Sequence, residues 1–423
     1  MAGDRRRENA SEESYNPPRS ETYDLDLAVN MQLLKILEPV TSDTLEDASD
    51  VISSGADAAL KRALSVDAVV STSSSFAHRN TAAQHEKPGD FRKIGAGACG
   101  VIYAPYGHSV AIKLSRANNT EELRNDYFMH MRIIDTFQTC GITRIKIPKC
   151  YGFVSKDDQK FWDNNPGLSE ASKQVCHLPT YALLTERILP LPEPTRTLLI
   201  DKFCADRLKS RAFKDASNND CVVRVYLGSL KGKSGGMFFS LRNLKLHLNQ
   251  MIELKIDLTS MASDMATALA AMHWVAKTDA RDIEFILASS TENLPQITTS
   301  EVTTLPLNTS IHPQKFNLED FHHRKTTLWL LDFNQVRQIT MDETGIAMAI
   351  EAFNINDPYY PKPLQQHPIA QELWNTFARR YLRMSLDILR GETDDIQKLP
   401  GLFLNGVVEF QQKKLECVAR AEG

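Results

Sequence analysis

A glycine-rich hairpin followed by a lysine-bearing strand is the feature that most constrains this chain. Residues 91–114 read FRKIGAGACGVIYAPYGHSVAIKL, with Gly95, Gly97 and Gly100 ahead of a short apolar strand that ends at Lys113. Glycine has no Cβ, so a turn built from it can approach phosphate groups closely, and a lysine on a neighbouring strand can reach the same phosphates. These four residues are therefore predicted to bind a nucleotide.

Two kinds of nucleotide site share the pattern G-x-G-x-x-G. A dinucleotide-binding fold needs a helix directly after the last glycine and an acidic residue about 20 positions further on. Here Val101, Ile102 and Tyr103 follow, and such residues predict a strand. The motif V-A-I-K ends at Lys113, 13 residues beyond Gly100, which is the spacing of a protein-kinase nucleotide flap. We therefore expect a kinase-like small lobe with ATP as the ligand.

Composition limits the class of protein and its surroundings. With 423 residues, 42% of them hydrophobic, and a net charge of −4, the chain resembles an ordinary soluble globular protein and gives no reason to expect nucleic acid as a partner. The first 20 residues lack the apolar core of a signal peptide, and no apolar run reaches membrane-spanning length, so no membrane partner is expected. Seven scattered cysteines without a C-x-x-C pair predict reduced thiols in the cytoplasm or nucleus and no zinc site.

The predicted fold is α+β and bilobal, like a protein kinase, with a small β-rich lobe, a larger mainly helical lobe and an N-terminal helical extension. Residues 1–20 are predicted to be a disordered tail, and 21–90 to hold amphipathic helices at 24–39 and 44–64 followed by a linker. This extension is expected either to pack on the small lobe or to bind a protein partner. The small lobe is placed at 91–195 and the large lobe at 196–423, with insertions at about 200–240 and 288–326.

The helix expected after Lys113 supplies a candidate partner for the lysine. Glu121 and Glu122 suit its first turn, where carboxylates favour the helix dipole. Of Asp126 and Glu122, Asp126 is preferred because it adjoins an inward-facing tyrosine, although a solvated aspartate on an exposed face is the alternative. Strands are predicted at 146–154 and 181–188, with a polar insertion at 157–177 between them. Glu186 marks the position where backbone groups would contact an adenine edge.

The large lobe carries the candidate catalytic and metal-binding acids. A helix predicted at 258–274 leads to the segment KTDARDIEFIL, in which Asp279 and Glu284 have the D-x-x-x-x-N spacing of a phosphotransferase loop. The apolar strand 328–331 ends in Asp332-Phe333-Asn334, which resembles D-F-G. Asp279 would orient or deprotonate an acceptor hydroxyl, and Asp332 and Glu284 would bind Mg²⁺. Further helices are predicted at 371–390 and 406–419.

Several departures from the kinase pattern leave catalysis open. Arg281 stands where kinases often carry a lysine facing the γ-phosphate, but Lys277-Thr278 replaces the usual His-Arg pair. Asp126 is shorter than the usual helix glutamate, and the acids at 279, 282, 284 and 332 would repel a polyanion unless a metal is bound. The two hypotheses are a divergent kinase-like enzyme and a non-catalytic pseudokinase scaffold that binds a protein through its N-terminal helices or residues 222–250.

Residues 221–389 also resemble a known family. The matching segments are VRVYLG with FFSLRNLKLHLNQM, AMHWVAKTDARDIEFIL, LWLLDFNQVR and NDPYYPKP, which are similar to an uncharacterised fungal domain family with a legacy "zinc finger" label. The resemblance implies a shared fold without an established activity and an accessory role near secondary-metabolite pathways. The label itself would imply DNA-associated regulation, which ranks last because Cys and His lack zinc-like spacing and the net charge is acidic.

Overall fold

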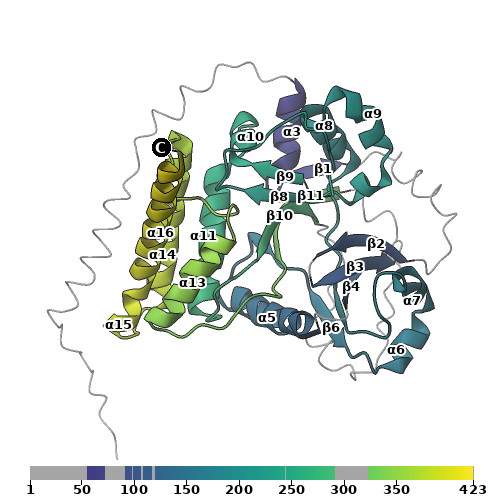
Figure 1. Cartoon of the computed structure of the whole chain (residues 1–423), viewed down its shortest axis with the longest axis horizontal. Helices are drawn as coiled ribbons and strands as arrows, with labels where there is room; N and C mark the ends of the chain where they lie inside the picture. Colours follow the sequence, from purple (N-terminus) through teal and green to yellow (C-terminus); the bar gives the residue numbers. More distant parts are fainter. Residues whose placement is uncertain are drawn as a thin grey trace, which may run out of the picture.

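The computed structural model describes residues 55–71, 91–97, 99–105, 108–116, 120–242, 244–290 and 323–422. Within them the chain folds into a mixed α+β structure with two separate sheets, so the α+β class is confirmed (Figure 1). The predicted tail, the predicted helix at 24–39 and most of the insertion at 288–326 lie outside the described residues. None of the described helices combines the length and the apolar character needed to cross a bilayer.

The first sheet has five antiparallel strands and contains the glycine hairpin. In sheet order the strands are β2 (Phe91–Ala96), β3 (Gly100–Pro105), β4 (Val110–Ser115), β7 (Ala182–Glu186) and β6 (Cys150–Val154). Helices α6 (Gln159–Asn164) and α7 (Pro166–Ser172) bury Trp162 and Leu168 against this sheet. The segment expected to be a polar insertion therefore contributes to the core of this sheet, because Trp162, Leu168 and Cys176 are buried there while most of its polar side chains are exposed.

The second sheet brings together strands from distant parts of the sequence. In sheet order they are β1 (Val69–Ser71), β11 (His323–Leu331), β10 (Glu284–Ser290), β8 (Val223–Tyr226) and β9 (Leu244–His247), with the short β5 (Ile145–Lys146) beside β11. The antiparallel register of β10 and β11 pairs Glu284 with Leu331. Because Asp332 follows Leu331 directly, this register brings two predicted acids to the same end of the sheet.

Helices cover one side of the second sheet (Figure 1). The innermost is α11 (Leu258–Trp274), which packs along α14 (Pro368–Ile388). α11 is rich in alanine and methionine and is buried on nearly every face, as expected of a central helix. α13 (Glu343–Ile355) and α16 (Leu399–Glu422) form an outer layer, with α15 (Asp394–Gln397) at its end. α5 (Thr120–Thr139) packs against both β6 and α11 and thus joins the two parts of the molecule.

The described part of the second predicted N-terminal helix is α3 (Gly55–Leu64). It packs beside α8 (Glu193–Phe203), where Asp57 pairs with Lys202 at 3.1 Å. Leu60 and Leu64 are fully buried in the main core. The apolar face of α3 is therefore covered by the larger core of its own chain rather than by the five-stranded sheet. The remaining short elements are α9 (Asp206–Lys214), η2 (Ala216–Asp220) and α10 (Leu248–Glu253).

A buried histidine makes the main core sensitive to acid. His273 on α11 is completely buried, and its Nδ1 lies 2.8 Å from the hydroxyl of Tyr381. Burial lowers the pKa of His273 to about 3, whereas a histidine in an unfolded chain titrates near pH ~6.5. Between these two values the unfolded state binds a proton that the native state does not. The free energy of unfolding therefore decreases as the pH falls through this window.

Replacement of His273 by Asn should weaken this pH dependence. One pKa unit corresponds to about 1.4 kcal/mol. At a pH about two units below the pKa of histidine in the unfolded chain, protonation of His273 should therefore have lowered the free energy of unfolding of the wild type by roughly 2–3 kcal/mol. The variant should not show this loss. Urea unfolding at a series of pH values measures the difference in slope. Replacement of the exposed His177 by Asn is the control for loss of an imidazole. Parallel curves for wild type and His273→Asn would contradict this account of the core.

Candidate functional site

Three segments that are far apart in the sequence meet at Lys113. Its Nζ donates to Asp126 Oδ2 on α5 at 2.7 Å and to Asp332 Oδ1, just after β11, at 2.8 Å. Burial by itself would lower the pKa of Lys113, but the two carboxylates outweigh burial and raise that pKa well above its usual value. Lys113 is thus a fixed positive charge where the two sheets meet. Glu122, the alternative partner, is exposed.

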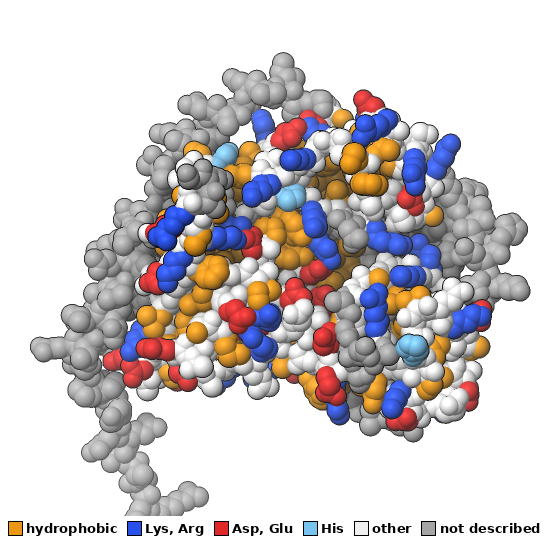
Figure 2. All heavy atoms as spheres, viewed as in Figure 1, with side chains coloured by type: hydrophobic (Ala, Val, Ile, Leu, Met, Phe, Trp, Pro, Cys, Tyr) orange, Lys and Arg blue, Asp and Glu red, His pale blue; other side chains and the backbone are white. Residues whose placement is uncertain are grey.

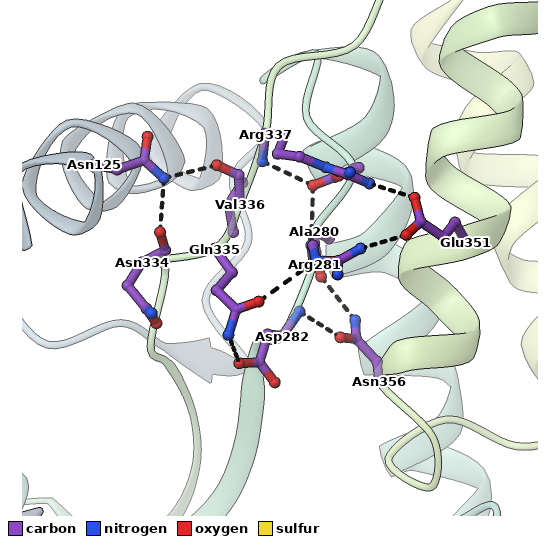
Figure 3. A network of polar contacts seen from close by, with 11 residues as sticks. Asn125, Ala280, Arg281, Asp282, Asn334, Gln335, Val336, Arg337, Glu351 and Asn356 are labelled. Atoms are coloured by element: carbon purple, nitrogen blue, oxygen red, sulfur yellow. Dashed lines mark hydrogen bonds and ion pairs between the residues drawn. The ribbon is translucent and has the colours of Figure 1, made fainter. Parts of the chain in front are cut away.

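α5 also fixes the chain that follows β11. Asp126 Oδ1 accepts a hydrogen bond from the backbone N–H of Phe333 at 3.2 Å. The side-chain amide of Asn125 donates to the carbonyl oxygens of Asn334 and Val336, both at 2.9 Å (Figure 3). Hydrogen bonds of this kind from a rigid helix hold a loop in one conformation. The acid that follows β11 is therefore held against the lysine by two neighbouring residues of one helix.

The glycine hairpin lies directly against the lysine. A Cβ added at Gly100 would come within 2.7 Å of the carbonyl oxygen of Leu114 and 3.1 Å of Lys113 Cγ, so only glycine fits there. Cys99 is buried, and its Sγ lies within 4.8 Å of oxygens of the two carboxylates that hold the lysine. Burial raises the pKa of the Cys99 thiol, and the nearby ammonium opposes this only in part. Position 99 is a variable position of the glycine motif, so Cys99 could not be predicted as part of the site.

The other two glycines are less constrained by their surroundings. Gly97 closes the turn with a 2.9 Å hydrogen bond from its N–H to the carbonyl of Gly100. A Cβ on Gly97 would meet nothing within 4 Å, and a Cβ on Gly95 would meet only the flexible side chain of Ile102. No described residue would clash with a side chain at position 97. The space beside this backbone is therefore open to a group that approaches from outside the fold.

Asp279 lies in a hydrogen-bond network that is centred on Arg337 and does not include Lys113. Its side chain is fully buried; Oδ1 accepts the backbone N–H groups of Arg281 and Arg337 at 3.1 and 2.9 Å, and Oδ2 accepts Arg337 Nε at 2.6 Å. Glu351 on α13 binds both arginines, at 2.8 Å to Arg281 and 3.0 Å to Arg337 (Figure 3). Asp279 and Arg281 therefore tie the loop to α13, and the structure does not bring either of them to Lys113.

Asp282, two residues before Glu284, is affected by the charge of Asp332. Its backbone N–H donates to Asn356 Oδ1 at 2.6 Å, and its Oδ2 accepts Gln335 Nε2, also at 2.6 Å (Figure 3). Asp282 is half-buried and has a left-handed backbone with φ of 58°. Burial and the negative charge of Asp332 raise the pKa of Asp282. In the sequence Asp282 appeared only as one of several crowded acids, because it has no place in the D-x-x-x-x-N spacing.

Glu284 completes a group of three acids with Asp282 and Asp332, which we call the acidic triad. Burial and the charges of the other two acids raise the pKa of Glu284, while Arg224 opposes them. Arg224 on β8 binds both oxygens of Glu284, at 2.6 Å to Oε1 and 2.9 Å to Oε2. Acidic side chains gather near the centre of the face in Figure 2. The triad has two basic partners, Arg224 at Glu284 and Lys113 at Asp332, for its three carboxyl groups.

Glu186 is the last residue of β7, and its carboxylate binds the chain just before β6. Its Oε2 accepts the backbone N–H of Lys149 at 3.1 Å, and burial raises its pKa. Two residues later, Ile188 packs with Leu331 against a small apolar cluster on β10 and β11 that is separate from the main core. The backbone of residues 186–188 thus runs beside an apolar surface at the junction of the two sheets.

The donor atoms present fit a magnesium ion better than a zinc ion. Mg²⁺ prefers carboxylate oxygens and is usually bound by one or two carboxylates together with substrate phosphates, so the acidic triad need not form a closed cage. Among the described residues, Cys99, Asp126 and Asp332 form a group of potential metal ligands whose ligand atoms all lie within 4.8 Å of one another. The ammonium of Lys113 already binds both of those carboxylates. A cation placed among these three would therefore be repelled by a like charge.

Comparison with known proteins gives a partial match. A family model described as a zinc finger protein, for a domain of unknown function, matches residues 328–393. The match runs from the end of β11 through Asp332, α13 and the whole of α14, and most of its buried residues belong to the main core. No curated protein and no solved structure matches the chain. The chain is therefore similar, over a small part of its length, to an uncharacterised domain with a legacy zinc finger label.

Proposed function

We propose that the protein is kinase-like and binds a magnesium complex of ATP between its two sheets. The observation that carries the proposal is the convergence at Lys113: a lysine on β4 lies under a glycine hairpin, is anchored by an acid on α5 and is hydrogen-bonded to an acid that follows β11. This is the combination by which kinases hold the α- and β-phosphates and place a metal ion. The two sheets would then be the cores of a small and a large lobe.

Each part of the ligand has a counterpart in the described residues. Gly95, Gly97 and Gly100 would cover the phosphates, and Lys113 would neutralise them. Asp332, with the rest of the acidic triad, would bind Mg²⁺, which would neutralise phosphate charge. The adenine ring would meet the backbone of residues 186–188 and the apolar cluster beside it. Because Asp332 is 30% exposed while one of its oxygens binds Lys113, it retains accessible surface for a ligand.

For phosphoryl transfer, we assign the acceptor-facing position to Asp282 rather than to Asp279. The buried carboxylate of Asp279 is already satisfied by two backbone N–H groups and Arg337. Asp282 is half-buried; the charge of Asp332 raises the pKa of Asp282, and the charge of Asp282 raises the pKa of Glu284. Asp282 would orient an acceptor hydroxyl, and Asp279 would hold the loop in place.

A nucleotide-binding scaffold without catalysis is the second candidate. The observation that favours it is the ion pair between Arg281 and Glu351 at 2.8 Å. Arg281 is the residue expected to face the γ-phosphate, and its guanidinium is bound to a carboxylate instead. Phosphoryl transfer depends on positioned positive charge around that phosphate. Single-turnover measurement of phosphate release from bound ATP separates the two candidates, because only the enzyme would turn over.

Thermal unfolding with ATP and a divalent ion tests the proposal. Saturation at about 100 times Kd should stabilise the protein by about 2.7 kcal/mol. The shift should be much smaller when EDTA replaces Mg²⁺ or Mn²⁺, because the acidic triad would then repel the triphosphate. If ATP leaves the melting temperature unchanged both with Mg²⁺ and with Mn²⁺, the nucleotide site is ruled out.

A further inference from the structure

A surface loop between β8 and β9 presents two apolar side chains to solvent. Met237 is 74% exposed and Phe238 is 90% exposed, while the next residue, Phe239, packs against the main core. Single exposed apolar residues are common on protein surfaces, but two adjacent ones at this exposure contribute almost no buried area to the fold. The pair therefore has no structural role within the described chain.

Specific hydrogen bonds hold this loop in place. At its start, Gly232 N–H donates to Asn249 Oδ1 at 2.9 Å, and Asn249 Nδ2 donates back to the carbonyl of Gly232 at 3.0 Å. At its end, Leu241 N–H donates to Asn218 Oδ1 at 2.7 Å. In between, Gly235 N–H donates to the carbonyl of Phe203 at 3.0 Å. The tip of the loop is thereby placed at the end of α8, next to the start of α9.

Basic side chains surround this position. Five exposed ones form no ion pair with any residue that the structure describes, and they come from α9 and from the loop: Arg207, Arg211, Lys214, Lys231 and Lys233. Residues 206–242 contain eight Lys and Arg but only three Asp and Glu, although the whole chain has a net charge of −4. Figure 2 shows basic and hydrophobic side chains together over the region of α8 and α9. We call α9 and residues 231–238 together the basic loop surface.

We propose that the basic loop surface binds an anionic lipid bilayer, with Met237 and Phe238 inserted among the acyl chains and the lysines and arginines at the headgroup phosphates. Apolar side chains at the tip of a rigid loop, flanked by positive charge, suit the boundary between headgroups and acyl chains. Nucleic acid would use the same charges, but it would leave Met237 without a partner, because single strands bind proteins through bases stacked on aromatic rings. The proposal does not depend on the nucleotide site.

Sedimentation of the full chain with lipid vesicles tests the proposal. We expect binding to phosphatidylcholine vesicles that contain about 30% phosphatidylserine, little binding to pure phosphatidylcholine, and release by salt. Lys231→Ala with Lys233→Ala should lower the partition coefficient roughly 30-fold, at the known contribution of each basic residue near an anionic membrane. Met237→Ser with Phe238→Ser should lower it at least about tenfold without lowering the melting temperature, because neither side chain is buried.

The matched control changes exposed apolar residues elsewhere. Phe410 and Leu415 on α16 are 43% and 44% exposed, and their replacement by Ser should leave vesicle binding unchanged. Equal binding to neutral and anionic vesicles, no binding to either, or full binding by the loop variants would overturn the proposal. The proposal would also be overturned if the protein bound a single-stranded oligonucleotide but not vesicles, and if the lysine substitutions abolished that binding.

Discussion

Lys113→Ala and Asp332→Asn should each remove about half or more of the stabilisation that Mg-ATP gives to the wild type. Lys113 would lose its charged hydrogen bonds to phosphate, which are worth about 1.5–3 kcal/mol each and correspond to a roughly 10- to 100-fold weaker Kd. Asp332→Asn would remove the charge at the best-placed metal ligand, and the exposed side of that residue makes the substitution compatible with folding. The melting temperature with and without Mg-ATP measures both effects.

The quantity to compare between variants is the change in melting temperature on adding Mg-ATP, not the melting temperature itself. Lys113→Ala leaves Asp126, which is only 3% exposed, without its ion-pair partner, so the variant will be less stable before any ligand is added. Lys156→Ala, at an exposed position beyond β6, is the control and should keep the full response to nucleotide. A wild-type-sized response in both site variants would place the nucleotide elsewhere or show that its effect is nonspecific.

Asp279→Asn should destabilise the fold far more than Asp282→Asn. An asparagine at 279 can still accept the two backbone N–H groups, but its amide would face the guanidinium of Arg337, donor against donor. Breaking a buried charged pair costs about 3–5 kcal/mol; because Arg337 is 38% exposed, we expect roughly 2–3 kcal/mol. Asp282→Asn can still accept from Gln335 and should cost less than about 1 kcal/mol. Urea unfolding of the two variants gives the comparison.

The same pair of variants separates structural from functional acids. If Asp282 faces the acceptor, Asp282→Asn should retain a stable fold and bound nucleotide but lose phosphate release, by about 10²-fold or more where the wild type turns over. A stable Asp279→Asn variant that binds nucleotide and has lost turnover would return the catalytic position to Asp279. Equal stability of the two variants would contradict the network drawn around Arg337 and Glu351.

Elements with a clear hydrophobic period could be predicted from the sequence. The helix expected at 258–274 has the bounds of α11, and the helix expected at 371–390 overlaps α14 almost completely. Alternating or continuous apolar residues likewise predicted β3, β4 and the end of β11. In each case a single element carries enough apolar residues to show which face is buried.

Other elements depend on contacts that a local pattern does not contain. α6 and α7 are short, and each buries few apolar residues, so the segment looked polar as a whole. α13 lies in a stretch for which no helix was predicted, and its Glu351 organises the arginines of the loop. Short elements of this kind are fixed by tertiary packing rather than by propensity.

The candidate site shows the same division. Lys113 was predicted from its spacing to the glycines, Asp126 from its place beside an inward-facing tyrosine on the next helix, and Asp332 from the D-F-G-like triplet after an apolar strand; the structure joins the three by hydrogen bonds. The loop between α11 and β10 is different, since left-handed backbone at Ala280 and Asp282, with φ of 53° and 58°, turns successive side chains in directions that no periodicity predicts. The D-x-x-x-x-N spacing therefore pointed to Asp279, whereas the structure places Asp282 within reach of the charge of Asp332.

Hydrogen–deuterium exchange with and without Mg-ATP is the sharpest test for a nucleotide site between the two sheets, because it reports where along the backbone a ligand acts. The account predicts slower exchange in three separate segments at once: the glycine hairpin at 95–100, the loop at 279–284 and residues 332–336. These segments are distant in the sequence: Gly100 and Asp332 meet at Lys113, and the loop contacts residues 332–336 through the hydrogen bond from Gln335 to Asp282. Protection confined to one of them, protection elsewhere, or none at all would contradict a shared nucleotide site.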